Sequence, residues 1–187
     1  MGKQFASIEA YHREFMERQR IFFNASACAE GRVNLSPRDV AALRVLGPKA
    51  VFYLDLTGSG NETAAHLLAD GRLTLMFCAF EGPPMVLRLY GKGRVIARGS
   101  QEYDQLLAEH FGARETPGAR QMIWLDVDGV QTSCGMNVPL FDYAGERDQL
   151  IRWAEKQGEA GLEEYWSKKN RQSIDGFPTP FAQEVVP

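Results

Sequence analysis

The sequence predicts a mainly β protein, in which one antiparallel, barrel-like domain with peripheral helices is followed by a C-terminal helical arm. Short strand-like runs separated by glycine and proline turns fill the chain from residue 21 to residue 133. The run 72–80 is apolar on both faces, which is typical of a barrel wall that also meets a helix or a subunit. After residue 140 the periodicity is helical. We therefore expect a barrel domain, residues 1–140, and a helical extension, residues 141–187, that packs on the barrel or on a dimer partner.

The first half of the barrel domain is expected to begin with a helix and to continue as strands. Apolar residues recur at helical spacing up to residue 22, and Ser7 is a suitable N-cap for this helix. The turn Glu30-Gly31 indicates a hairpin, and Pro37 is expected to end its pairing because proline cannot donate to a ladder. The expected elements are a helix at 8–22, strands at 22–27, 32–36 and 50–56, and a helix that begins near residue 62.

The second half continues the alternation of strands and turns. The turn Glu81-Gly82-Pro83-Pro84 separates two strands, and a later helix has Ser100 as its N-cap and Gly112 as its stop signal. The expected elements are strands at 72–80, 85–94 and 121–133, helices at 101–110, 146–156 and 162–169, and an extended segment at 177–187.

Composition argues against several classes of protein. The 187 residues carry a formal charge of −3 with scattered basic residues, so nucleic acid is not an expected partner. No run is apolar and long enough to span a membrane, and residues 1–10 lack a secretory signal, so we expect a cytoplasmic protein without a membrane partner. Cys28, Cys78 and Cys134 are far apart, and we expect small apolar fillers rather than a metal site.

The polar loop Thr57-Gly58-Ser59-Gly60-Asn61-Glu62-Thr63 (the 57–63 loop) is the most informative motif. It lies between a strand-like and a helix-like run. Its glycines allow successive N–H groups to turn inward, and the helix start adds unpaired donors and the positive end of its dipole. The loop could therefore cradle a phosphate, with side-chain donors from Ser59, Asn61 and Thr63. The same residues also suit an ordinary capped turn. The P-loop lysine and the dinucleotide fingerprint are both absent.

With its flanking segments, this loop resembles the pyridoxamine 5′-phosphate oxidase-related FMN-binding proteins. The resemblance covers residues 5–135 and rests on Val33-Asn34-Leu35-Ser36-Pro37 and on the runs 51–63, 72–77 and 86–93. It implies a six-stranded antiparallel Greek-key split β-barrel that forms a homodimer, with two FMN sites at the subunit interface. The tail runs Ser133-Cys134-Gly135 and Ser173-Ile174-Asp175-Gly176 are similar to those of a bacterial subgroup without an assigned substrate.

The resemblance also implies a set of cofactor-binding residues. It places the flavin phosphate at the 57–63 loop, the strand of Asn34 and Ser36 beside the ring and ribityl chain, and main-chain groups near Leu54 and Asp55 against the ring. Other members have Ser-Arg-Lys where this chain has Asn61-Glu62-Thr63, so two cations are replaced. Arg38 is the first candidate for the replacement charge and Arg88 the second, although an arginine in such a strand often pairs with a neighbouring carboxylate. The expected set is Asn34, Ser36, Arg38, Leu54, Asp55, Thr57, Gly58, Ser59, Gly60, Asn61, Glu62, Thr63 and Arg88.

Three functional classes follow from the resemblance. The first is an FMN-dependent oxidoreductase acting on a small substrate that the sequence does not identify. The others are a flavin carrier or sensor without turnover, and a split barrel that binds F420 or haem. Oxidation of pyridoxamine 5′-phosphate itself is not favoured, because Trp166, Asn170 and Arg171 match the substrate-gripping tail of that oxidase only in part. Trp166 forms a helical stripe with Leu162 and Tyr165, which predicts a core or dimer contact.

Overall fold

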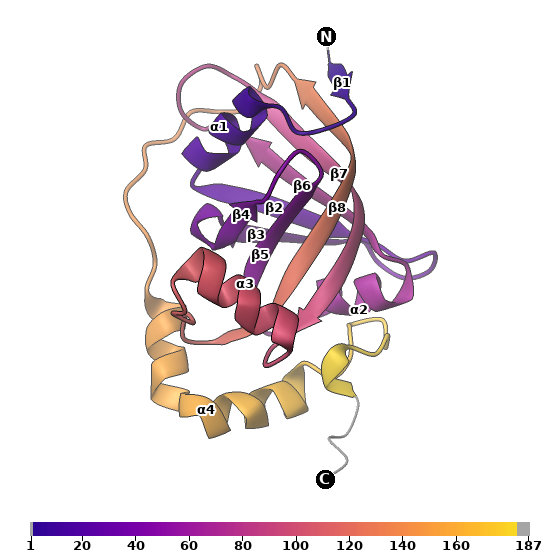
Figure 1. Cartoon of the computed structure of the whole chain (residues 1–187), viewed down its shortest axis with the longest axis vertical. Coiled ribbons are helices and arrows are strands. Elements are labelled where there is room, and N and C mark those ends of the chain that lie inside the picture. The colour runs from indigo at the N-terminus through magenta and orange to yellow at the C-terminus, as the bar shows by residue number, and fades with distance from the viewer. Residues whose placement is uncertain (1, 183–187) are drawn as a thin grey trace.

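The computed structural model describes residues 2–182. Its centre is an eight-stranded antiparallel sheet, in the order β3-β2-β6-β7-β8-β5-β4 with β1 beside β8, which curls into a split barrel (Figure 1). Six strands form the wall, and two strands of three residues each, β1 and β4, were not predicted. The bounds are β1 (Lys3–Phe5), β2 (Ile21–Ser26), β3 (Asn34–Asp39), β4 (Leu43–Val45), β5 (Ala50–Leu56), β6 (Arg72–Cys78), β7 (Val86–Ala97) and β8 (Ala119–Ser133).

The helices lie around the barrel and at its ends. In Figure 1, α1 lies at the end of the barrel near the N-terminus, while α3 and α4 lie at the opposite end. The predicted caps of α3 are confirmed, because Ser100 Oγ accepts from the Tyr103 N–H and Gly112 is left-handed with φ 60°. The bounds are α1 (Ala10–Arg18), α2 (Glu62–Ala69), α3 (Gln101–Phe111) and α4 (Gln149–Lys169), with short 3₁₀ turns at Val40–Ala42 and Pro180–Ala182.

The N-terminal helix is shorter than predicted. Phe22 belongs to β2, and the N-cap of α1 is Glu9 rather than Ser7. The Glu9 N–H donates to His12 Nδ1 at 3.0 Å. Because this side-chain acceptor satisfies a donor at the helix start, α1 begins at Ala10 instead of two residues earlier, at the predicted position 8.

The prediction for Pro37 was also wrong. Strand β3 continues to Asp39, with Pro37 opposite Phe23 of β2. Among the described residues, strand β3 lies at an edge of the sheet and pairs only with β2. The sheet therefore tolerates the missing N–H of Pro37, because no described strand lies on the other side to need it. The hairpin itself, with Gly31 at φ 86° in its loop, is confirmed.

The C-terminal predictions hold in part. Helix α4 is broken at Gly158, where φ is 64° and ψ is 177°, so the two predicted helices are one broken element. The described part of the predicted extended tail contains a 3₁₀ turn, and residues 183–187 lie outside the described residues. Of the three cysteines only Cys78 is buried, so the filler prediction fails for exposed Cys134. Within residues 2–182 no helix combines the length and apolar character needed to cross a bilayer.

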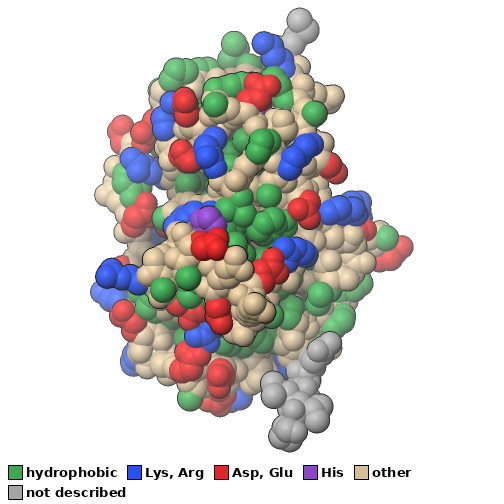
Figure 2. Space-filling view, viewed as in Figure 1, with side chains coloured by type: hydrophobic (Ala, Val, Ile, Leu, Met, Phe, Trp, Pro, Cys, Tyr) green, Lys and Arg blue, Asp and Glu red, His purple; other side chains and the backbone are tan. Residues whose placement is uncertain are grey.

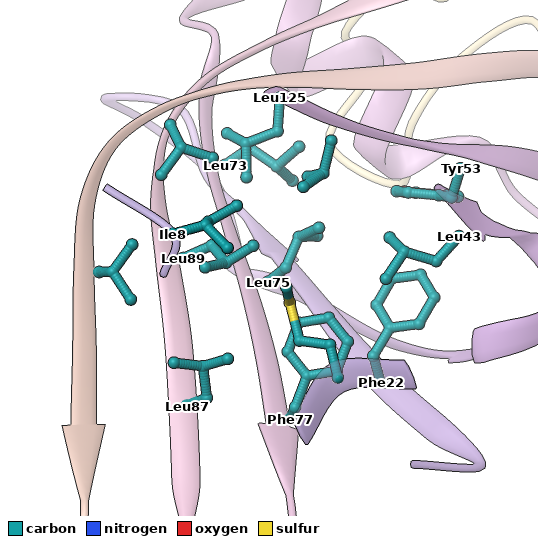
Figure 3. Packing of buried hydrophobic residues seen from close by; sticks show 14 of the residues in the cluster. Ile8, Phe22, Leu43, Tyr53, Leu73, Leu75, Phe77, Leu87, Leu89 and Leu125 are labelled. Carbon is teal, nitrogen blue, oxygen red and sulfur yellow. The ribbon is translucent and has the colours of Figure 1, made fainter. Parts of the chain in front are cut away.

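The main hydrophobic core fills the barrel interior (Figure 3). Leu75 and Phe77 of β6 are completely buried, and Phe77 stacks on Phe22 with ring centroids 5.5 Å apart. Each such side chain contributes about 1.5–3 kcal/mol through burial. A second cluster around Phe52 and Met122 packs under α3, and a third, with Trp166 at its centre, holds α4. The second and third clusters bring α3 and α4 against the end of the barrel that carries the 57–63 loop.

Candidate functional site

A crevice of about 550 Å³ lies beside the 57–63 loop. Three parts of the chain form it: the inward face of β3, the loop with the start of α2, and the segment that follows α4. Eight of the expected residues line it, namely Asn34, Ser36, Arg38, Gly58, Ser59, Gly60, Glu62 and Thr63. Five further lining residues were not predicted, namely Arg120, Lys169, Gln172, Ser173 and Ile174.

Strand β3 presents a polar wall to the crevice. Its alternation leaves Asn34, Ser36 and Arg38 half-buried on one face. Ser36 Oγ donates to Asn34 Oδ1 at 3.1 Å, and Asn34 Nδ2 donates to Thr63 Oγ1 at 3.0 Å. Asn24 Nδ2 donates to the same hydroxyl at 2.6 Å. These bonds fix the wall to the first turn of α2, so the polar face of β3 and the loop form one continuous surface.

The main chain of the loop provides donors. Within residues 2–182, the N–H groups of residues 59–63 donate to no main-chain acceptor and no side chain. Asn61, the N-cap residue of α2, makes no capping hydrogen bond from its side chain. Its Oδ1 instead accepts from Gln121 Nε2 at 2.7 Å. The ordinary capped turn is therefore not what forms here, and the loop keeps the free donors that an anion needs.

A buried carboxylate at the base of the loop is shared by two arginines. Asp55 Oδ2 lies 2.9 Å from Arg120 Nε and 2.8 Å from Gln121 Nε2, and its Oδ1 lies 3.1 Å from Arg38 Nη2. Burial by itself would raise the pKa of Asp55, but the charges of Arg120 and Arg38 and these hydrogen bonds hold that pKa below its usual value. Asp55 is therefore an anion, and it neutralises only one of the two guanidinium charges.

Arg120 was missed by the sequence analysis, although it is the most connected residue of the site. Its side chain is 3% exposed, and Nη1 donates to Gly60 O and to Asn170 Oδ1, both at 2.8 Å. A Cβ on Gly58 would lie 3.9 Å from Arg120 Nη2. The one local signal is an arginine just before the apolar run 122–125 of β8. Its partners, however, come from residues 50 and more positions away.

The tail after α4 is anchored to the loop. Trp166 Nε1 donates to Thr57 Oγ1 at 2.8 Å, which confirms the core contact predicted for Trp166. Asn170 Nδ2 donates to Gly58 O at 3.1 Å, and the Ile174 N–H donates to the Glu62 carboxylate. In Figure 1 the C-terminal segment accordingly lies next to α2. The crevice is thus formed by segments that lie far apart in the sequence.

The remaining expected residues lie outside the crevice lining. Thr57 anchors the loop, because its N–H and its Oγ1 both donate to Gly118 O. Leu54 packs in the second core cluster, but β4 pairs with β5 only as far as Tyr53, so the main chain of Leu54 has a strand partner on the β8 side only. Arg88 lies apart from the crevice, with Nη1 3.4 Å from Ser133 Oγ.

Charged side chains of both signs lie on the surface of the protein and in the crevice. On the face shown in Figure 2, acidic and basic side chains are interspersed rather than gathered into one field. The crevice itself is lined by three cations, Arg38, Arg120 and Lys169, and by one acid, Glu62. With Asp55 behind it, the site has three positive and two negative groups, a balance of plus one that favours an anionic ligand.

The fold and crevice define a split-barrel protein with a polar, net positive crevice between its barrel and its tail. A family model described as pyridoxamine 5′-phosphate oxidase matches residues 8–134, and the chain belongs to this family. It is 37% identical over 190 residues to a pyridoxamine 5′-phosphate oxidase family protein, ustO, of Aspergillus flavus, covering 93% of this chain and 76% of the relative.

Solved structures confirm the split-barrel fold. A single-residue variant of HupZ from Group A Streptococcus superposes with a TM-score of 0.53 at 15% identity, covering 67% of this chain and 99% of that protein. A Lactobacillus delbrueckii protein named after pyridoxamine 5′-phosphate oxidase gives a TM-score of 0.52 at 16% identity, covering 67% and 94%. At these identities the likeness concerns the fold alone.

Proposed function

We propose that this protein is an FMN-binding flavoprotein and an oxidoreductase that acts on a small substrate. The observation that carries the proposal is the crevice, where the 57–63 loop, whose N–H groups at residues 59–63 donate no main-chain hydrogen bond within the described residues, lies beside three cations and the polar wall of β3. Main-chain donors at a helix start and an arginine are the usual means of holding a phosphate. The fold family adds the flavin as the group to which that phosphate belongs.

The residues of the crevice divide into three roles. The N–H groups of residues 59–63, with Lys169 and Arg120, hold the phosphate, and Arg38 and Asp55 set the charge behind it. Asn34 and Ser36 lie along β3 where the ribityl chain and ring edge would pack. When bound, FMN supplies the hydride chemistry, and the protein supplies position and electrostatics. No side chain is assigned a proton-transfer role.

The alternatives are distinguished by what the purified protein carries. Among residues 2–182 no histidine, cysteine, methionine or tyrosine lines the crevice, so the usual axial ligands of haem are not among its lining residues. A flavin carrier without turnover and an F420-binding protein would use the same crevice. The first experiment is therefore mass spectrometry and absorption spectroscopy of the small molecule released on denaturation. FMN is the expected result, and stopped-flow reduction with NAD(P)H followed by oxygen then separates an oxidoreductase from a carrier.

Replacement of Lys169 by methionine is expected to weaken FMN binding by about tenfold, because one charged partner of the phosphate is lost. Riboflavin, which lacks the phosphate, should bind equally well to the variant and the wild type. Lys168→Met is the matched control, because Lys168 pairs with Glu164 and does not line the crevice. Fluorescence titration with both ligands measures the effect. An equal loss for FMN and riboflavin would place the phosphate elsewhere.

We also propose that the protein is a homodimer that uses the outer face of β3. The polar residues of β3 face the crevice, whereas Leu35 faces outward with 64% exposure. In a usual edge strand the polar residues face outward and the apolar ones face the core. Val33, on the same side, is 72% exposed. Exposed apolar residues on an open sheet edge are typical of a subunit contact.

Replacement of Leu35 by aspartate is expected to raise the dimer dissociation constant at least about tenfold, since a charge would be buried in an apolar contact. Leu68→Asp is the control, because Leu68 is 57% exposed on α2, away from β3. Sedimentation velocity over a range of concentrations measures the change. Wild-type protein that remains monomeric throughout would reject the dimer proposal.

A further inference from the structure

The tail turn Ser173-Ile174-Asp175-Gly176, here called the clasp, is fixed in shape by its own hydrogen bonds. The Gly176 N–H donates to Ser173 O, and the Phe177 N–H donates to Ser173 Oγ, both at 3.0 Å. Gly176 has φ 83°, which favours glycine at that position. The clasp is therefore a preformed turn, and its two central residues are free to contact other elements.

The clasp is joined to both sides of the crevice. On one side, the Ile174 N–H donates to the two Glu62 carboxylate oxygens at 3.1 and 3.0 Å, at the start of α2. On the other side, Asp175 Oδ2 accepts from the Arg32 N–H at 2.7 Å and its carboxylate pairs with the Arg32 guanidinium. A Cβ on Gly31 would lie 2.8 Å from Asp175 Oδ2, so the hairpin approaches as closely as glycine permits.

A second tail residue covers the opposite end of the loop. Asn170 is completely buried, and it donates to Gly58 O at 3.1 Å while its Oδ1 accepts from Arg120 at 2.8 Å. The tail is thus bonded to the loop at Gly58 and again at Glu62, and Ser173 and Ile174 line the crevice between these points. A group seated on the loop N–H donors has the tail as its outer wall.

We infer that the clasp makes the crevice selective for a terminal phosphate monoester and excludes a phosphate that is esterified a second time. This inference rests on the proposed function. In FMN the phosphate ends the molecule, whereas in FAD the same phosphate continues into an adenylate that must leave the loop. The adenylate of FAD would have to pass Asn170, which is bonded to Gly58, and Ile174, which is bonded to Glu62. These hydrogen bonds between the tail and the loop would therefore have to break. The selectivity comes from a steric block on the longer ligand rather than from extra contacts with the shorter one.

The test compares the ratio of dissociation constants for FMN and FAD between the wild type and Glu62→Ala/Asp175→Ala. In the wild type FAD is expected to bind at least about 100-fold more weakly than FMN, and in the variant the ratio should fall to about tenfold or less. Removing Glu62 also removes a negative charge near the phosphate, and because the monoester of FMN carries more negative charge there than the diester phosphate of FAD, this effect alone would raise the ratio and is opposite to the expected fall. Flavin fluorescence titration measures binding without any need for turnover.

Two further variants keep the test decisive. Asp128→Ala/Glu155→Ala removes the same charges from exposed positions outside the crevice and should keep the wild-type ratio. Arg32→Ala removes the guanidinium that pairs with Asp175 of the clasp, and the Arg32 side chain is 70% exposed, so the variant should fold normally. The ratio of the FAD and FMN dissociation constants should fall in this variant too, by a smaller factor. Equal binding of FMN and FAD to the wild type, or an unchanged ratio in the clasp variant, overturns the inference and leaves the proposed function standing. Failure of the wild type to bind either flavin overturns both.

Discussion

Replacement of Arg120 by methionine is expected to lower the free energy of unfolding by about 3–5 kcal/mol, because a buried carboxylate would lose its closest cation. Asp55 is 1% exposed and Arg120 is 3% exposed, with 2.9 Å between Oδ2 and Nε. Methionine has a similar length and fills much of the space, so the main loss is electrostatic rather than a cavity. Urea unfolding followed by tryptophan fluorescence measures the change.

The control for this variant is Arg152→Met. Arg152 pairs with Asp148 at 3.0 Å, but the two side chains are 66% and 69% exposed, and such a pair contributes less than about 1 kcal/mol. A loss in Arg120→Met no larger than in Arg152→Met would show that Arg120 does not offset the Asp55 charge. FMN affinity of the folded Arg120 variant should fall as well, since Arg120 also fixes Gly60 O of the loop.

The cost of Arg120→Met should depend on pH. In the wild type the pKa of Asp55 is lowered, despite the opposing effect of burial, by Arg120, Arg38 and hydrogen bonds. Its stabilising contribution is therefore complete above the unfolded-state pKa of about 3.9 and is lost as the pH falls through the lower folded-state pKa. Without Arg120 the folded-state pKa of Asp55 rises, so Asp55 is protonated at a higher pH in the variant than in the wild type. The deficit in the free energy of unfolding should shrink between about pH 7 and about pH 4. A deficit independent of pH would mean that Asp55 is not the coupled group.

The parts of the fold that were predicted correctly have local signals. Strand β5 has its predicted bounds, and α3 has its predicted caps at Ser100 and Gly112, because alternation, capping and left-handed glycine are written in neighbouring residues. The missed strands β1 and β4 have three residues each; β1 pairs with a distant strand, with Lys3 opposite Thr132, while β4 pairs with the neighbouring β5, with Val45 opposite Val51. Short strands of this kind carry no periodicity long enough to detect.

The same distinction holds for the site. The glycines and polar residues of the 57–63 loop indicated a phosphate cradle from local chemistry, whereas Asn34, Ser36 and Arg38 were expected from the family resemblance, and eight of the expected residues line the crevice. Arg120 was not found, since its importance lies in Asp55, 65 positions earlier, and in Asn170, 50 positions later. The clasp was visible only as a family-like run, and its contact with Glu62 spans 112 residues. Contacts at such separations are determined by the tertiary fold, which no local pattern encodes.

Replacement of Trp166 by alanine is expected to detach the tail from the loop without unfolding the barrel. Trp166 is 5% exposed, it packs against Phe181, and its Nε1 donates to Thr57 Oγ1 at 2.8 Å. The third hydrophobic cluster is separate from the barrel core, so its loss of about 3–5 kcal/mol falls mainly on the arm. Amide hydrogen exchange within 162–179 should accelerate by at least about 100-fold, while β6 and β7 keep their protection.

Trp166→Phe separates the ring from its hydrogen bond. Phenylalanine keeps most of the packing and loses only the Nε1 donor, at a cost of about 1 kcal/mol. Thr57 Oγ1 still donates to Gly118 O at 2.7 Å, so no donor is left unpaired in this variant. If the tail forms the outer wall of the crevice, Trp166→Ala should also loosen Asn170 and Ile174 and lower the FMN-over-FAD selectivity as the clasp variant does. Trp166→Ala with unchanged exchange in the arm would mean that Asn170 and the clasp hold the tail without this anchor.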